Sequence, residues 1–234
     1  MSTSQLPLGL RFPPDQRLRS YRDAPPGLLE LLAVLAGGDA ADSVFLSGAS
    51  GAGKSHLLLA MCAEAAAHGC PAAYLPLKLF AARAGEALVG QGAVPLACVD
   101  DVQSIVGDRV AEIALFDLHN RVRDAGGALL YAADATPLQL ALVLPDLRSR
   151  LAQCTQFVLA VPDEASCRAI LRERAQVRGL ELDDAVLEWL FRRVDRDLAT
   201  LTALLDRLDR ESLAAQRRIT VPFLRQILAD DQDS

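Results

Sequence analysis

The sequence predicts an α/β fold, in which a parallel sheet carries helices on both faces, followed by a small all-helical domain. Two observations indicate this. Short apolar runs alternate with helical patterns as far as residue 161, and only helical patterns follow Pro162. Apolar residues make up 51% of the 234 residues and aromatic residues only 5%, so a sizeable core can form, built mainly from Ala and Leu.

Five apolar runs are the expected strands of the sheet. They cover residues 44–47, 72–76, 95–99, 128–132 and 155–160. Because helical segments separate these runs, we expect the strands to be parallel and buried on both faces. The helices expected in this part cover residues 27–36, 54–68, 77–89, 109–124 and 137–143. Gly37 and Gly38 would end the first helix.

The α/β domain is expected over residues 27–161 and the helical domain over residues 162–234. The second domain should contain helices at 164–178, 184–193, 197–215 and 221–230. Its third helix places several leucines on one face, namely Leu198, Leu201, Leu204, Leu205 and Leu208. Residues 1–26 are polar and carry several prolines, so they predict a flexible tail and lead-in.

The strongest motif is Gly-Ala-Ser-Gly-Ala-Gly-Lys-Ser at residues 48–55, which fits the phosphate-loop pattern G-x-x-x-x-G-K-[ST]. Glycines allow a tight turn whose N–H groups surround an anion. Lys54 would reach the β- and γ-phosphates, and the Ser55 hydroxyl would hold Mg²⁺. The next helix would direct its positive end at the phosphates. The alternative is a glycine-rich turn with an incidental lysine. The nucleotide-binding residues expected here are Gly48, Gly51, Ala52, Gly53, Lys54, Ser55 and His56.

Acidic residues follow two of the expected strands. Asp100 and Asp101 come after the run 95–99, as in a Walker B strand. Asp100 would hold the water shell of Mg²⁺, and Asp101 could act as a general base toward an attacking water. Asp134 follows the run 128–132 and would lie beside Asp100, where a γ-phosphate could be sensed. The alternatives are solvated acids at a strand end and, for Asp134, a helix cap before Pro137.

Three further features have both a functional and an ordinary interpretation. Arg148 and Arg150 precede the last strand, where an arginine could reach a neighbour's nucleotide in trans; spacing alone favours a solvated basic turn. Arg196 could fold over a bound nucleotide or form a surface pair with an aspartate. Gln5-Leu6-Pro7-Leu8-Gly9-Leu10 suits an extended peptide in an apolar groove of a partner, or a leader without function.

Composition excludes several classes of function. The net charge of −6 disfavours direct binding to DNA phosphates, so DNA contact is expected only through a partner. No signal peptide or apolar run of transmembrane length is present, and we expect a cytoplasmic protein without membrane contact. The five cysteines form no C-x-x-C pair and the three histidines have no metal-ligand spacing, so reduced core cysteines and no transition-metal site are expected.

Taken together, these motifs resemble the AAA+ family and, within it, the DnaA-related proteins of replication. The similarity covers most of residues 5–230. Besides the phosphate loop it is carried by residues 99–103, 118–123, 144–151, 194–198 and 216–224. The resemblance implies that Arg150, and not Arg148, is a trans-acting arginine finger. It also implies that Asp134 is the sensor 1 residue, Arg196 the sensor 2 arginine, and the helical domain a lid.

The resemblance also implies partners and a function. Gln5, Leu6, Leu8 and Leu10 match a peptide that docks on the β sliding clamp of DNA polymerase III. DnaA-like initiators continue into a DNA-binding helix-turn-helix domain, and this sequence ends after the lid, so we expect a regulator. It would bind ADP or ATP with Mg²⁺, dock on the DNA-loaded clamp and stimulate ATP hydrolysis by DnaA in trans. Replication initiation would thereby be inhibited.

Alternatives to this function follow from the same residues. One is a cis-acting AAA+ ATPase, and another is an adaptor resembling a helicase loader. We expect activation of a partner's ATPase rather than rapid turnover by the chain itself, and the resemblance is compatible with a homo-oligomer. Family members carry an aromatic-x-x-Gly-x-Asn segment near the adenine. Of this segment the present sequence retains only Tyr21.

Overall fold

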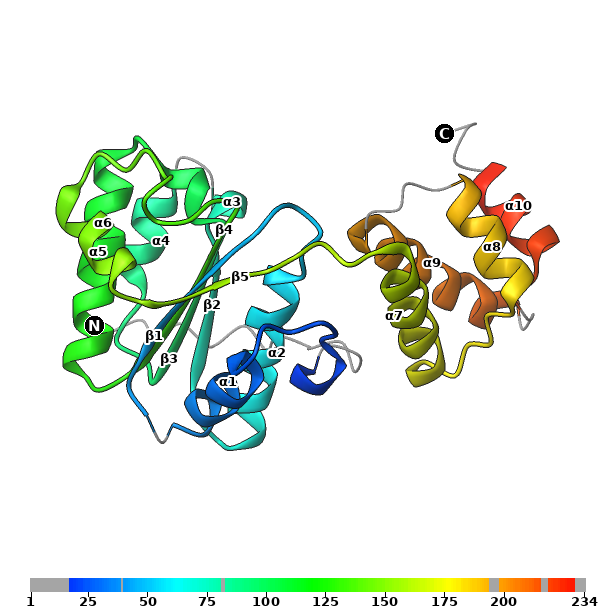
Figure 1. Cartoon of the computed structure of the whole chain (residues 1–234), viewed down its shortest axis with the longest axis horizontal. Helices are drawn as coiled ribbons and strands as arrows, with labels where there is room; N and C mark the ends of the chain where they lie inside the picture. The colour runs from blue at the N-terminus through cyan, green and yellow to red at the C-terminus, as the bar shows by residue number, and fades with distance from the viewer. Residues whose placement is uncertain (1–16, 39, 81–82, 194–197, 216–218, 230–234) are drawn as a thin grey trace.

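The computed structural model describes residues 17–38, 40–80, 83–193, 198–215 and 219–229 (Figure 1). The peptide Gln5–Leu10 and Arg196 therefore lie outside the described residues. The α/β domain contains a five-stranded sheet, as predicted. Its strands are β1 (Ser43–Ser47), β2 (Ala72–Pro76), β3 (Leu96–Asp100), β4 (Ala128–Ala133) and β5 (Thr155–Val158).

All five strands run parallel, in the order β2-β3-β4-β1-β5. In the register, Phe45 of β1 lies opposite Tyr131 of β4 on one side and Gln156 of β5 on the other. Every residue of β1, β3 and β4 is buried, which explains why these strands read as continuous apolar runs. β1 therefore occupies an interior position in the sheet, with the phosphate-loop motif directly after it.

Helices cover both faces of the sheet (Figure 1). Alternate strand residues pack into the core on each face. Val44 and Leu46 face a core with α1 (Leu28–Gly37) and α2 (Lys54–Ala67). Phe45 faces the other core. That core is formed with α3 (Leu77–Phe80), α4 (Ala84–Gly90), α5 (Arg109–Asp124) and α6 (Pro145–Ala152). The five cysteines are free, and four of them are buried.

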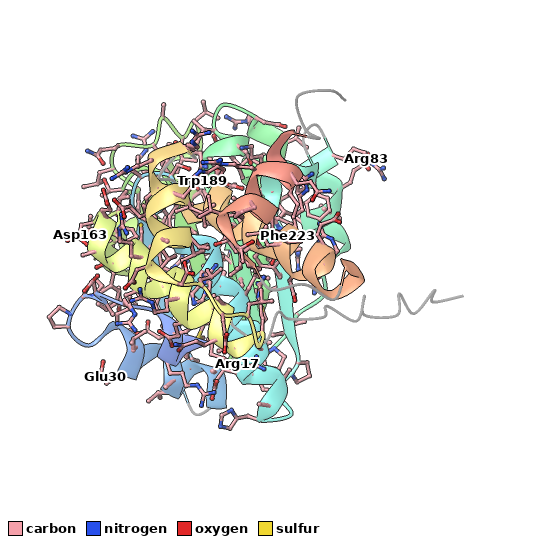
Figure 2. The ribbon with its side chains drawn as sticks, turned by 90° about the vertical axis from the view of Figure 1, so that its right-hand side faces the viewer. Arg17, Glu30, Arg83, Asp163, Trp189 and Phe223 are labelled. Atoms are coloured by element: carbon pink, nitrogen blue, oxygen red, sulfur yellow. The ribbon has the colours of Figure 1, made fainter. Side chains whose placement is uncertain are left out.

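The helical domain follows β5 and has its own hydrophobic core. It contains α7 (Glu164–Val177), α8 (Asp184–Arg193), α9 (Leu198–Ala215) and α10 (Val221–Ala229). Figure 2 faces this domain and labels Trp189 and Phe223, which belong to its core or pack against it. Over the ranges that the structure describes, no helix combines the length and apolarity needed to cross a bilayer.

The predicted elements differ from the structure in three places. The helix expected over 77–89 is divided into α3 and α4. The helix expected over 137–143 is a turn, in which Thr136 donates from both its backbone N and its hydroxyl to Gln139 Oε1, at 3.1 and 2.9 Å. Arg148 and Arg150, which spacing alone places in a turn, lie on α6, because Pro145 at its first position starts a helix there.

The lead-in also differs from the expected tail. Leu18–Ser20 form a short 3₁₀ helix (η1), and Leu18 is buried in the core that contains α1 and α2. Residues 17–21 of this segment therefore contact the domain, through the buried Leu18 side chain and the hydrogen bond of Tyr21.

A buried carboxylate connects α5 with the segment that enters α6. Glu112 is fully buried, and its oxygens accept hydrogen bonds from the backbone N–H groups of Gly107 (2.9 Å), Val143 (3.1 Å) and Leu144 (2.7 Å). A buried charge is tolerated when several donors satisfy it, as they do here. This carboxylate therefore adds polar contacts to the apolar packing between α5 and α6.

Replacing Glu112 with alanine should destabilise the protein strongly. Three buried N–H groups would lose their acceptor, and we expect the free energy of unfolding to fall by about 3 kcal/mol in urea denaturation. Glu86→Ala is the matched control, since Glu86 is exposed and pairs with Arg83 on the surface; its effect should stay below about 1 kcal/mol. Equal effects of the two substitutions would contradict the role of Glu112.

Candidate functional site

The motif at residues 48–55 forms a tight loop between β1 and α2. Gly51 (φ +81°) and Gly53 (φ +84°) adopt left-handed backbone conformations that favour glycine. At Gly48 a Cβ would come within 2.5 Å of the Leu159 carbonyl oxygen, so only glycine fits beside the chain leaving β5. Helix α2 begins at Lys54 and directs its N-terminal N–H groups at the loop. This geometry can hold a phosphate.

Lys54 lies among the loop carbonyls and near the expected acids. Its ammonium donates to the carbonyl oxygens of Gly48 (2.5 Å) and Ala49 (2.9 Å). Burial lowers the pKa of this ammonium, and three nearby carboxylates oppose that shift. These are the carboxylates of Asp100, Asp101 and Asp134. The structure therefore brings together the lysine and all three acids that the sequence placed at strand ends.

A tyrosine hydroxyl lies beside Asp100 and Ser55, the expected Mg²⁺ residues. Tyr74 of β2 donates to Asp100 Oδ2 at 2.8 Å, and the Ser55 side chain lies close to the same hydroxyl. Burial and the neighbouring carboxylate raise the pKa of Tyr74 far above its usual value. Carboxylate and hydroxyl oxygens are ligands that Mg²⁺ accepts, so the residues present fit this ion.

Sequence reasoning missed Tyr74, although a signal existed. It lies near the carboxyl end of the strand expected at 72–76, which neighbours the strand that ends in Asp100. The Tyr74 hydroxyl is the one polar side-chain group on β2.

Gln103 joins the other two acids. Its Nε2 donates to Asp101 Oδ1 at 2.9 Å, and its Oε1 accepts from the backbone N–H of Asp134 at 3.3 Å. Asp101 itself has a left-handed backbone (φ +56°), which is strained for a non-glycine residue and is often found at functional sites. A carboxylate held in this way beside a phosphate loop can polarise a water molecule.

A cavity of about 290 Å³ adjoins the phosphate loop on the side of the helical domain. Its lining includes Tyr21, Gly53, His56, Pro162, Ile170 and Arg174. Tyr21 donates to the Ala52 carbonyl at 2.9 Å, and its ring lies so close to Gly53 that a Cβ there would be 2.7 Å from a ring carbon. Burial raises the pKa of Tyr21 to about 12, so it remains a neutral donor. The cavity has the size and mixed lining of a small-ligand site.

His56 links this cavity to the helical domain. Its Nδ1 lies 3.1 Å from the Arg174 guanidinium, and its Nε2 lies 3.3 Å from the Arg17 carbonyl oxygen. Because an arginine can only donate, His56 accepts at Nδ1 and donates from Nε2, which defines a neutral tautomer. Arg174 also donates to Thr202 of α9 at 2.6 Å, so a single buried side chain connects α2, α7 and α9.

The sequence also contained a signal for Arg174, namely its position among the apolar residues of one helix face. Arg174 lies on the buried face of α7, with Cys167, Ile170 and Leu171. An arginine on an apolar helix face needs a polar partner. Two surface contacts reinforce the same junction: Arg22 pairs with Glu173 at 2.8 Å, and Ser166 donates to Asp23 at 2.7 Å.

Arg150 lies at the opposite edge of the sheet. It is an exposed residue in the last turn of α6 and lines a recess of about 150 Å³ at the starts of β1 and β5. Since β1 has five residues, about 16 Å of strand separates this recess from the phosphate loop. The Arg150 guanidinium donates no hydrogen bond to any side chain or carbonyl in the described part of the chain.

His119 lines this recess, and the pKa of its imidazole is sensitive to the charges there. It is buried, stacks on Tyr131 and shares a 2.9 Å hydrogen bond with that hydroxyl. Burial lowers its pKa to about 4, assisted by the positive charges of Arg150 and Arg123. At neutral pH the imidazole is therefore uncharged, beside two guanidinium groups.

Comparisons with known proteins agree with this architecture. Residues 163–228 match the family model of the Hda lid domain. Domain III of the replication initiation protein DnaA from Thermotoga maritima is similar, with TM-score 0.71, 22% identity, and coverage of 93% of this chain and 97% of that chain. AMPPCP-bound DnaA from Aquifex aeolicus has TM-score 0.64 and 22% identity, over 88% and 71% of the two chains. RuvB from Thermotoga maritima has TM-score 0.55 and 17% identity, over 84% and 66%. The predicted AAA+ fold with a helical lid is confirmed.

Because the pKa of His119 is low in the folded protein, the free energy of unfolding should depend on pH under acidic conditions. The unfolded chain binds this proton with the ordinary pKa of about 6.5 and the folded chain only near 4, so we expect the free energy of unfolding to fall as the pH is lowered between these values. Titration of the His119 ring signals by NMR should give a midpoint near 4. In Arg123→Gln the midpoint should rise, because one positive charge is removed. A wild-type midpoint near 6.5 would contradict both the burial of this ring and its proximity to the two arginines.

Proposed function

We propose that this chain, an AAA+ protein related to DnaA and Hda, regulates the replication initiator DnaA by stimulating its ATP hydrolysis in trans. The observation that carries the proposal is the position of Arg150. This exposed arginine has no hydrogen-bond partner among the described residues and lies at the sheet edge farthest from its own phosphate loop. Such a residue can serve a nucleotide held by another subunit, which is how arginine fingers act.

The chain would hold its own adenine nucleotide, ADP or ATP, between the AAA+ domain and the lid. Support comes from the phosphate loop and the adjoining cavity, and from the similarity to a DnaA structure that contains AMPPCP. Lys54 would bind phosphate oxygens. Ser55 and Asp100 would hold Mg²⁺ and its waters, and the ion would neutralise phosphate charge. Tyr21 and the lid contacts of His56 would form the wall of the base and ribose site.

Arg150 would act on the ATP of DnaA. As the γ-phosphoryl group leaves, negative charge develops on its oxygens and on the bridging oxygen, and a guanidinium placed there stabilises that charge. Hydrolysis would leave DnaA in its ADP form and so limit initiation of chromosome replication. The nucleotide bound by the regulator itself would serve to set the shape that presents α6.

The β sliding clamp is the second proposed partner. The supporting feature is the peptide Gln5–Leu10 with its alternating leucines, which lies outside the described residues. Docking through this peptide would bring the regulator to DNA without a basic surface of its own, in keeping with the net charge of −6.

The competing function is hydrolysis in cis. It is favoured by the arrangement of Asp101, Gln103 and Asp134 beside Lys54, which is suited to orienting a water. A single-turnover assay with the isolated protein and ATP separates the two functions. Rapid turnover without DnaA would favour the enzyme, and slow turnover the regulator.

Arg150→Ala should abolish stimulation. With ATP-loaded DnaA and clamp-loaded DNA, we expect the stimulated hydrolysis rate to fall by about 10³-fold, the effect typical of losing an arginine finger. Arg148→Ala is the matched control: it removes the same charge two residues earlier on α6, where Arg148 donates to the Leu142 carbonyl. Its rate should remain within a few-fold of wild type.

ADP binding by each variant shows whether a loss of stimulated hydrolysis comes from the missing arginine or from misfolding. Arg150→Ala should bind ADP like wild type, whereas Lys54→Ala should lose that binding. If Arg150→Ala still stimulates DnaA at the wild-type rate, the trans mechanism is wrong.

The double substitution Gln5→Ala, Leu8→Ala should abolish binding to the clamp, because it removes the polar and apolar anchors of the docking peptide. Surface plasmon resonance on immobilised clamp would measure this. Ser4→Ala, just before the peptide, is the control and should bind normally, and all variants should retain ADP. Undiminished clamp binding by the double variant would exclude this peptide as the docking element.

A further inference from the structure

The recess beside Arg150 contains a second arginine from a different helix. Arg123 lies in the last turn of α5, is exposed and lines the same cavity of about 150 Å³. One of its N–H groups donates to the Ala41 carbonyl at 2.8 Å, which holds the guanidinium at the rim while leaving its other donors available. Two elements distant in sequence therefore present positive charge to one small space.

The recess also contains a buried hydroxyl without a partner. Ser43 is 6% exposed and lines the cavity, and its Oγ forms no hydrogen bond with any described residue. Its backbone N–H donates to Asp42 Oδ1 at 2.7 Å. A buried hydroxyl normally has a partner, since leaving it unpaired costs free energy. An unpaired hydroxyl beside two guanidiniums indicates a place for an acceptor supplied by a ligand.

The charges around this space favour an anion. Arg123 and Arg150 contribute two positive charges. Asp42 lines the same space with one negative charge, and one of its oxygens is already occupied by the Ser43 N–H. His119 is neutral at physiological pH. The balance is one net positive charge with several free N–H and O–H donors, which matches phosphate oxygens.

We propose that Arg123 and Ser43 complete an anion-binding recess around Arg150, and that this recess holds terminal phosphate oxygens of the partner's nucleotide. The proposal rests on the proposed function and extends it to two further residues. Arg150 is exposed, and no hydrogen bond to a described residue fixes its guanidinium. Arg123, fixed by the Ala41 carbonyl, would add a second point of contact, and Ser43 a third, so the phosphate would be oriented as well as attracted.

Stimulated hydrolysis by ATP-loaded DnaA, with clamp-loaded DNA and the nucleotide-bound regulator, tests the roles of both residues. We expect Arg123→Ala to lower the rate about tenfold or more, and Arg123→Lys to restore part of it, since lysine keeps the charge but not the forked geometry. Arg192→Ala is the charge-matched control. Arg192 is exposed on α8 and pairs with Glu188, so its loss should not alter the rate.

Ser43→Ala separates function from structure. Removing an unpaired buried hydroxyl should leave the free energy of unfolding unchanged or slightly higher, because no hydrogen bond is lost. The stimulated rate should nevertheless fall a few-fold. A variant that is as stable and as active as wild type would show that Ser43 contacts no phosphate.

Inorganic triphosphate provides a test that does not need DnaA. Added to regulator saturated with ADP, so that the phosphate loop is filled, it should shift the NMR signals of the His119 ring in a saturable manner and raise the His119 pKa, since the anion offsets the two guanidiniums. The shift should be lost in Arg123→Ala and retained in Arg192→Ala.

The outcomes distinguish the two proposals. Suppose that Arg150→Ala abolishes stimulation while Arg123→Ala changes neither the rate nor the triphosphate shift. The proposal of an anion-binding recess is then wrong, and the proposed function stands. If Arg150→Ala leaves stimulation intact, the proposed function is wrong; a triphosphate shift that requires Arg123 would then still support an anion site, for another ligand. Absence of any triphosphate shift in the wild type would overturn the recess as an anion site.

Discussion

The parallel direction of the five strands is the constraint on which the rest of the structure depends. Because every strand points the same way, all carboxyl ends meet at one edge and all amino ends at the other. The loops after β1, β3 and β4 therefore bring Lys54, Asp100 and Asp134 together, although 80 positions of sequence separate the first from the last. Helical crossovers cover both faces and leave the edges as the places where polar side chains can gather.

The same constraint separates the two proposed sites. The phosphate loop follows β1, and the recess with Arg150 lies where β1 and β5 begin. A residue at one edge cannot serve a ligand at the other through a direct contact. In the proposed mechanism, the chain's own nucleotide and the partner's nucleotide therefore occupy opposite edges, connected only through the rigid sheet and its helices.

Two buried polar side chains maintain the arrangement around that sheet. Glu112 joins α5 to the segment that enters α6, and these helices carry Arg123 and Arg150, so this carboxylate contributes, with the shared apolar core, to the spacing of the two arginines. Arg174 plays the corresponding part at the lid, where it joins α7 and α9 to His56 of α2. A ligand that altered the position of His56 would therefore act directly on the lid.

The sequence by itself determined the strands, the main helices, the phosphate loop and the acids at Asp100, Asp101 and Asp134. These features depend on local patterns: apolar runs, helical periodicity, and glycines where the backbone must be left-handed. It did not determine α6, because Pro145 starts a helix too short to show a periodicity.

Only the tertiary structure decided the contacts of Tyr74, Gln103 and Arg174, and the recess of Ser43, Arg123 and Arg150. Those residues are far apart in the chain, and each is ordinary in its local context. They meet because β1 lies between β4 and β5 and because α5 packs beside α6, which are consequences of strand order and burial that no local pattern contains.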